Sequence, residues 1–224
     1  MKTKYLLQIL TTILLLHALS ACVAVQEIGN VVEVSQQHER IAVVPIQAAL
    51  ERKLWMSTDK YNELCQLKSE ETQQRIYRFL EFYSRSGALH AEMMTPDEVN
   101  SILHGANYPN TNLSNVELCS LLHVDAIIFG NIQVWEPVDE VTALMLNSAT
   151  QNGQIITNIV QLSLSLYDAK RGEQIWNGQE TMHGQLGSFK DNMQRQICRR
   201  AVRNLPYNIK KRRYKKAYQT LNGF

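Results

Sequence analysis

The residue types that support metal binding occur in this chain, but they do not form a complete set of ligands. Cys119 and His123 lie four residues apart in a segment of helical periodicity, so both side chains could reach one metal ion. Structural metal sites need three or four ligands, and no Cys or His at a suitable spacing completes this pair. Asp139 and Glu140 are adjacent carboxylates in a loop, where we expect them to be solvated. We therefore expect no metal and no cofactor.

Motifs that carry catalysis are also missing. The chain contains no Gly-x-Ser-x-Gly nucleophile turn, no glycine-rich loop that could cradle a phosphate, and no His-Glu-x-x-His pair of zinc ligands. The sequence therefore predicts a protein that is not an enzyme.

Cys22 is the residue with the clearest predicted chemistry. Lys2 and Lys4 precede an apolar run over 6–18, which is shorter than the ~20 residues of a membrane-spanning helix and fits the core of a signal peptide. The run ends on Leu-Ser-Ala-Cys at 19–22, which resembles a bacterial lipobox. This resemblance implies cleavage after a signal peptide over 1–21, a diacylglycerol on the Cys22 sulfur and an acylated new N-terminus, including palmitate. An ordinary signal peptide with an incidental cysteine is the alternative.

The lipobox resemblance also implies a location. One acyl chain anchors only marginally at ~0.8 kcal/mol per buried CH₂, so several chains on Cys22 would hold the protein on a membrane without a spanning helix. Val23 follows the cysteine where inner-membrane retention signals usually carry Asp. We therefore expect a lipid anchor in the outer membrane, facing the periplasm, with residues 22–39 as the lipidated cysteine and a tether.

The remaining chain suits one domain, which we predict over 40–206. Three further cysteines, Cys65, Cys119 and Cys198, lie in apolar helical patterns. One disulfide with a buried thiol and three buried thiols are both compatible with this count.

Periodicity predicts the order of elements inside this domain. Short β-branched or alternating runs predict strands over 40–46, 88–94, 124–135, 154–168 and 173–183. Helical spacing predicts one long or two shorter helices over 61–83, two helices that begin at capping boxes at Thr95 and Ser114, and a last helix over 189–205, whereas 47–57 is ambiguous. The fold class is therefore α/β: a mixed four- to five-stranded sheet with helices packed against it and a C-terminal antiparallel hairpin plus helix.

Residues 207–224 form a basic C-terminal tail. Between Arg199 and Lys216 there are nine Lys or Arg and no acid. The export signal argues against nucleic acid. Anionic lipid headgroups, at ~1 kcal/mol per basic residue near a charged surface, or other envelope polyanions remain as partners. A solvated tail is the alternative. The residues of the tail that would contact an anionic surface are Lys210, Lys211, Arg212, Arg213, Lys215 and Lys216.

Three stretches together resemble the curli-secretion lipoprotein superfamily. They are RIAVVPI at 40–46, LLHVDAIIFGNI at 121–132 and LSLYDAKRGEQIWNG at 164–178. The superfamily includes curli secretion channels, penicillin-binding-protein activator lipoproteins and lipoproteins of exopolysaccharide export. His123 and Arg171 depart from the pattern, because the family usually has Gly and Thr there.

Four residues in these stretches are predicted to have structural roles. Asp125 lies at a helix–strand junction and Asp168 begins a turn, where each carboxylate can accept hydrogen bonds from backbone amides. Gly172 tolerates the positive φ that closes this turn, and Trp176 offers a large area to cover one face of the sheet.

The resemblance and the anchor predict an adaptor or activator of periplasmic or outer-membrane machinery, in secretion or cell-wall assembly. We expect an envelope protein as its partner. Self-association into a homo-oligomer is a further possibility. A subunit of an export channel and a glycan- or peptidoglycan-binding module are the alternatives. Residues 136–153 are too short for two membrane-spanning strands, which argues against a pore. The apolar residues 141–146 predict a contact with a partner or a membrane surface, with a covered loop as the alternative.

Overall fold

The structure is a computed structural model that describes residues 25–27, 30–150 and 155–207. The predicted signal peptide, Cys22 and the six basic residues from Lys210 to Lys216 lie outside the described residues. A single sheet of seven strands has the order β1-β7-β6-β5-β2-β4, and β3 pairs with β5. The strands are β1 (Val25–Glu27), β2 (Arg40–Val43), β3 (Gln47–Leu50), β4 (Glu92–Met93), β5 (Ala126–Trp135), β6 (Ile156–Asp168) and β7 (Glu173–Gln185).

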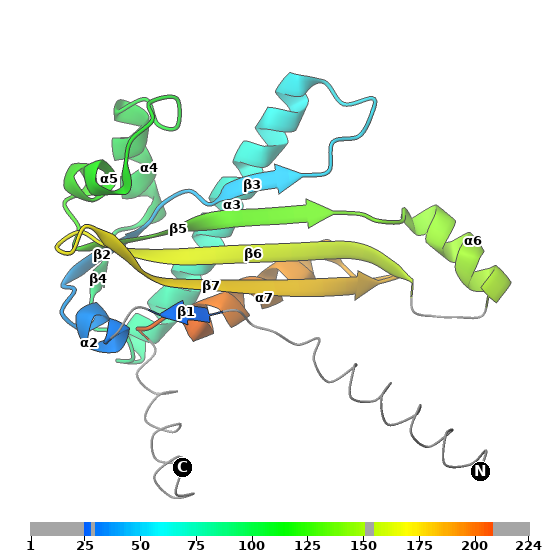
Figure 1. Cartoon of the computed structure of the whole chain (residues 1–224). Coiled ribbons are helices and arrows are strands. Elements are labelled where there is room, and N and C mark those ends of the chain that lie inside the picture. The colour runs from blue at the N-terminus through cyan, green and yellow to red at the C-terminus, as the bar shows by residue number, and fades with distance from the viewer. Residues whose placement is uncertain (1–24, 28–29, 151–154, 208–224) are drawn as a thin grey trace, which may run out of the picture.

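Helices cover one face and one end of this sheet (Figure 1). They are α2 (Val31–Ser35), α3 (Thr58–Arg85), α4 (Pro96–Gly105), α5 (Asn115–Leu122), α6 (Glu140–Thr150) and α7 (Lys190–Asn204). The early strands β2 to β5 pair in parallel, and β5, β6, β7 and β1 pair antiparallel. The predicted mixed α/β fold with a C-terminal hairpin and helix is confirmed, although the sheet has more strands than expected.

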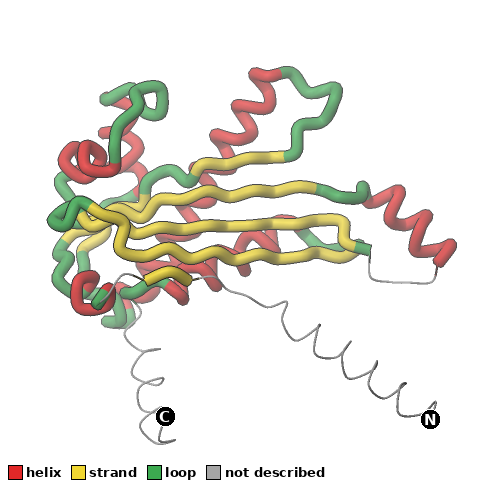
Figure 2. Tube along the Cα trace, viewed as in Figure 1, coloured by secondary structure: helices red, strands yellow, loops and turns green. Residues whose placement is uncertain are grey.

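The alternating pattern of β6 decides which face of the sheet is covered. Val160, Leu162, Leu164 and Leu166 point into the main core, which the long helices α3 and α7 close from behind. A second cluster forms where α4 and α5 pack on the end of the sheet, against Ile127 and Tyr167. The opposite face of the β5–β6–β7 ribbon stays open, as Figure 2 shows.

The region around Ser69 is one helix, which resolves the alternative that the periodicity left open. α3 runs over 28 residues from Thr58 to Arg85, with Ser69 inside it. The Ser57 hydroxyl accepts from the amide of Lys60 and caps its start, and Gly87 follows its end at φ 66°.

Both predicted capping boxes are confirmed. The Thr95 and Ser114 hydroxyls accept from the amides of Glu98 and Glu117, and each Glu carboxylate accepts from the amide of its capping residue. These boxes fix where α4 and α5 begin.

The structure corrects the prediction that residues 22–39 are a tether. Residues 25–27 form β1, which pairs with β7, and residues 31–35 form the short helix α2. Val31 and Val34 are buried in the main core, three residues apart on one face of that helix. The apolar contacts of these valines hold the segment on the domain. Tyr207, which was assigned to the tail, is buried in the same core.

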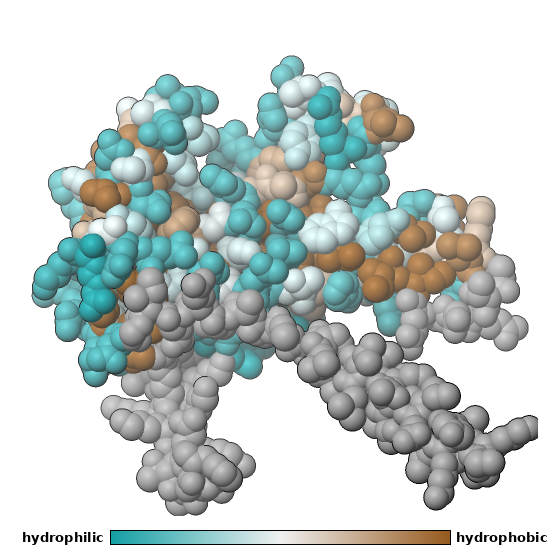
Figure 3. Space-filling model, in the orientation of Figure 1, coloured by the Kyte–Doolittle hydropathy of each residue, from teal (hydrophilic) through white to brown (hydrophobic). Residues whose placement is uncertain are grey.

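Residues 140–150 form the helix α6, so the alternative of a covered loop at 141–146 is wrong. Val141, Leu144 and Met145 are 63%, 61% and 66% exposed. Figure 1 shows α6 projecting beyond the ends of β5 and β6, and Figure 3 shows apolar surface on it. Within the part of the chain that is described, no helix is long and apolar enough to cross a membrane.

Candidate functional site

The open face of the sheet carries rows of uncharged polar side chains that cross three strands. The register aligns Asn131 of β5 with Ser163 of β6 and Gln179 of β7. The next row aligns Phe129, Ser165 and Asn177. Successive rows lie ~7 Å apart along the strands, and neighbouring side chains in a row lie ~5 Å apart. The rows therefore form a regular lattice of amide and hydroxyl groups.

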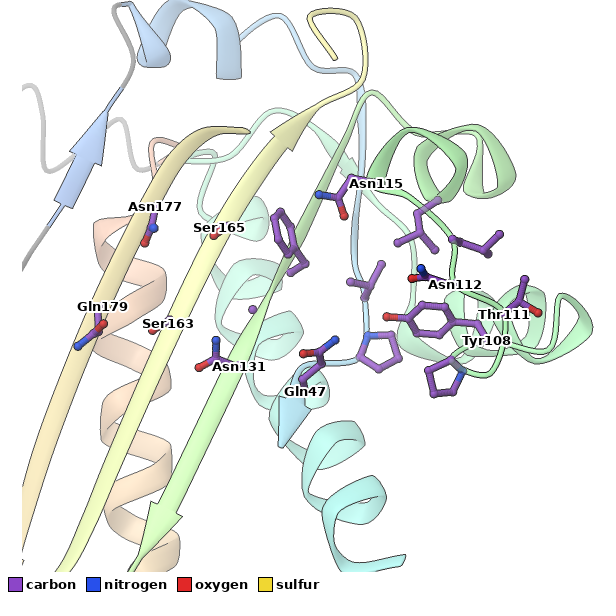
Figure 4. A pocket seen from close by; sticks show the side chains of 17 residues that line it. Gln47, Tyr108, Thr111, Asn112, Asn115, Asn131, Ser163, Ser165, Asn177 and Gln179 are labelled. Carbon is purple, nitrogen blue, oxygen red and sulfur yellow. The ribbon is translucent and has the colours of Figure 1, made fainter. Parts of the chain in front are cut away.

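The loop between α4 and α5 forms one wall beside these rows of polar side chains. The segment between α4 and α5 brings Tyr108, Thr111 and Asn112 toward the rows, and Gln47 closes the groove from the start of β3 (Figure 4). The result is a groove of about 510 Å³. Sequence reasoning interpreted Ser163 and Ser165 only as a solvated strand face and did not find this wall, because nothing local in residues 106–114 predicts where the loop lies.

None of the residues that line the groove carries a charge. Burial raises the pKa of Tyr108, so its hydroxyl stays protonated at neutral pH. The side chains of Asn131, Ser163 and Gln179 make no hydrogen bond to another described residue. The groove therefore offers unused donors and acceptors beside two aromatic rings, Phe129 and Tyr108.

The lining of the groove consists of uncharged hydrogen-bonding groups and apolar side chains. Its hydroxyls have no histidine or carboxylate beside them that could act as a base. Among the described residues, no group of three or more His, Cys, Asp or Glu could hold a metal ion. What the groove can do is form hydrogen bonds to an uncharged ligand and stack on it.

Asp125 joins the start of β5 to the start of β2. One of its carboxylate oxygens accepts from the amides of Glu39 and Arg40, at 2.7 and 2.9 Å. The amide of Asp125 in turn donates to the carbonyl of Arg40 at 2.8 Å. The residue thus serves the backbone at a helix–strand junction and lies outside the groove.

Asp168 accepts hydrogen bonds inside its own turn and from a distant side chain. Its Oδ1 accepts from the amide of Arg171 at 2.6 Å, and Gly172 closes the turn at φ 68°. Its Oδ2 lies 2.9 Å from Nε2 of His38, whose Nδ1 lies 2.6 Å from the hydroxyl of Tyr207. Burial, together with the nearby Asp168, raises the pKa of Tyr207 well above 10, so Tyr207 donates to His38 and His38 donates to Asp168.

This His38–Asp168–Tyr207 network has no surface on which a substrate could react. The side chains of His38 and Asp168 are each 4% exposed. The network ties together the segment before β2, the hairpin turn and the end of α7. Sequence reasoning found Asp168 and missed the two partners, because both were placed outside the domain.

Trp176 is buried on the core face of β7, at 1% exposure. Its ring lies over Gly178, where an added Cβ would come within 2.6 Å of the indole. The glycine therefore makes the room that lets the indole lie flat against its own strand.

Cys119 and His123 are not brought together as metal ligands. Cys119 is buried, whereas His123 is exposed in the left-handed region at φ 52°. Desolvation raises the pKa of the Cys119 thiol to about 11. Cys65, Cys119 and Cys198 are all free thiols, which decides against a disulfide among them.

No protein-family model matches the chain, and no curated protein matches its sequence. Solved structures with a similar fold include the PelC dodecamer from Paraburkholderia phytofirmans, at 11% identity and a TM-score of 0.41 over 81% of this chain and 96% of that one. The lipoprotein GNA1162 from Neisseria meningitidis matches at 12% identity and a TM-score of 0.38, over 69% of this chain and 87% of that one. The LpoB C-terminal domain from Salmonella enterica matches at 8% identity and a TM-score of 0.32, over 65% of this chain and 83% of that one.

These similar structures include a lipoprotein and a dodecamer. At such identities and TM-scores the similarity carries no argument about the partners or activity of this chain. The resemblance to the curli-secretion lipoprotein superfamily stays a prediction.

Proposed function

We propose that this chain is a non-enzymatic adaptor or activator of envelope machinery, anchored by lipid on Cys22 in the outer membrane and facing the periplasm. The observation that carries the proposal is the groove: a walled lattice of unused hydrogen-bonding groups with no acid, base or metal site in its lining. Such a surface binds a partner without reacting with it. The Leu-Ser-Ala-Cys sequence at 19–22 supports the anchor.

Site-specific photo-crosslinking in intact cells tests the adaptor role. A crosslinker at Asn131 or Gln179 probes the groove, and one at the exposed Arg78 on the covered side serves as control. We expect one envelope protein to be captured from both groove positions, and the capture to be lost when Ser163→Trp fills the groove. Capture only at Arg78, or turnover of peptidoglycan by the purified protein, would refute the proposal.

The anchor has its own test. The native chain is expected to carry acyl mass on Cys22 and to fractionate with membranes, and Cys22→Ser is expected to appear in the soluble periplasmic fraction. A Cys22→Ser chain that stays membrane-bound after export and after a high-salt wash, which releases electrostatic binding, would contradict the lipid anchor.

A glycan-binding module is the second candidate, and the uncharged lining of the groove favours it. Planar amides and hydroxyls match the hydroxyl groups of a sugar, and Tyr108 and Phe129 offer rings for stacking. Calorimetry with neutral oligosaccharides would test it: we expect binding that Asn131→Ala with Gln179→Ala weakens at least ~10-fold. The control is Gln66→Ala with Gln74→Ala on α3, outside the groove lining.

An export-channel subunit receives less support. The insertion at 136–153, which was the candidate for membrane-inserted hairpins, contains the helix α6 over 140–150. A homo-oligomer belongs to the adaptor proposal as well, and electron microscopy of the lipid-modified protein would reveal a ring.

A further inference from the structure

The position of β1 shortens the connection between the domain and its predicted lipid. Val25 pairs with Gly178 and Glu27 with Trp176, so β1 is fixed along the outer edge of the sheet (Figure 1). Cys22 lies only three residues before Val25. Three residues span at most ~11 Å, whereas a tether that ended at residue 39 would reach roughly 50–60 Å. The lipid therefore attaches close to the β1 edge.

The exposed side of α7 is basic at the same part of the molecule. Met193, Ile197 and Ala201 face the core, whereas Arg195, Arg199 and Arg200 are exposed. The sequence from 192 to 207 contains no acidic residue. Within the described part of the chain, none of these three arginines forms an ion pair.

One hydrogen bond connects the two features. Asn204, at the end of α7, donates to Glu180 of β7 at 2.6 Å. Glu180 lies two residues along β7 from Gly178, the partner of Val25. The C-terminal half of α7 therefore lies near the β1 edge of the sheet, where the predicted lipid is attached.

We infer that the β1 edge of the sheet rests directly on an anionic lipid bilayer, with the α7 arginines over the headgroups. This inference rests on the lipid anchor of the proposed function. Each basic residue near such a surface strengthens binding about fivefold. The short connection and the arginines act together: the lipid fixes the distance, and the charges fix which side of the domain faces the membrane. The open groove is then presented sideways to the periplasm.

The charge part of the inference is tested with the Cys22→Ser mature chain, which carries no lipid. Binding is measured to vesicles with 30 mol% phosphatidylglycerol (about a third of the lipid) and to neutral vesicles, at two salt concentrations. Arg199→Glu with Arg200→Glu is expected to weaken binding to the anionic vesicles more than ~20-fold. The matched control is Arg52→Glu with Lys60→Glu, which changes net charge equally on the β3 side of the sheet, and it should change binding less than ~3-fold. Equal losses in both pairs would overturn the inference, as would full retention in the arginine pair.

The orientation is tested with the native lipid-modified chain. In vesicles that contain a photoactivatable lipid, peptides from 25–39 and 190–207 are expected to carry the crosslinks. Crosslinks on α6 or on 47–62 instead would show that another surface faces the bilayer. Deleting residues 208–224 separates the contribution of the basic tail, and crosslinks should persist on 190–207. If the chain carries no acyl mass, the anchor fails, whereas the charge test still decides the role of the arginines.

Discussion

His38 donates from Nε2 to Asp168 across 2.9 Å, joining residues that are 130 positions apart in the sequence. The bond holds the segment before β2 against the turn that connects β6 and β7. Tyr207 completes the network from the end of α7, so three separate parts of the chain meet at one buried imidazole. The folded domain therefore includes His38 and Tyr207, which lie just outside the range 40–206 that the sequence predicted.

Replacing His38 with Ala is expected to destabilise the domain by about 2–4 kcal/mol. The change removes a partner of a buried carboxylate and leaves the Tyr207 hydroxyl without an acceptor. The free energy of unfolding is measured in urea. His90→Ala, at an exposed position, is the control and should cost no more than ~0.5 kcal/mol. Similar losses in the two variants would show that the network does not stabilise the fold.

Adding a methyl group at Gly178 is expected to destabilise the domain by about 1–3 kcal/mol. The new Cβ would lie 2.6 Å from the Trp176 ring, which is fully enclosed and has little room to move. Thermal unfolding reports the effect. Gly105→Ala is the matched control because its Cβ meets nothing within 4 Å, and it should stabilise α4 by about 0.5–1 kcal/mol. Two variants of equal stability would contradict the packing of the indole over β7.

Replacing His123 with Gly is expected to stabilise the domain by about 1 kcal/mol. His123 ends α5 at φ 52°, a left-handed conformation that costs free energy for residues with a Cβ and not for glycine. Ser120→Gly, inside the same helix, is the control and should cost about 0.5 kcal/mol. Loss of stability in His123→Gly would show that the imidazole makes a contribution larger than the backbone strain.

Local signals in the sequence predicted most of the fold. The alternation in β6, the hairpin turn at Asp168–Gly172 and the capping residues Thr95 and Ser114 each act over a few neighbouring residues, so one short window contains the cause. β1, α2 and β3 were not predicted, because strands of three or four residues and a helix of five give too short a pattern. Their existence depends on edges and core surfaces that other segments provide.

The candidate site was the least predictable part. Asn131, Ser163 and Gln179 become neighbours only through the register of three strands, and Tyr108 reaches them from a loop that follows another helix. The buried His38 network has the same origin, since its members are 130 and 169 residues apart. The strand pattern predicted that one face of β6 is solvated, but it did not predict that the loop with Tyr108 lies beside this face.

Glu71 is expected to make stability depend on acid pH. Partial burial works to raise the pKa of its carboxyl, but hydrogen bonds from Lys68 and Arg75, at 2.6 and 2.5 Å, outweigh burial and hold the pKa below 4.5. A carboxyl with a lowered pKa in the folded state stabilises the fold above its unfolded pKa, and this contribution is lost as pH falls through the folded pKa. Below pH 4.5, the free energy of unfolding measured in urea should therefore fall more steeply for the native chain than for Glu71→Gln. The exposed Glu63→Gln is the control, and a Glu71→Gln profile parallel to the native one would refute the assignment.

Thiol reactivity tests the packing of α5 and α7 directly. Desolvation raises the pKa of Cys119 to about 11 and that of Cys198 to about 12, so neither forms appreciable thiolate at pH 8. Cys65 is only half-buried on α3. With Cys22 blocked by lipid or replaced by serine, a disulfide reagent should titrate one thiol rapidly in the native chain and three in denaturant. Cys65→Ser should abolish the rapid reaction, whereas rapid modification of Cys198 would mean that α7 is not packed on the sheet as described.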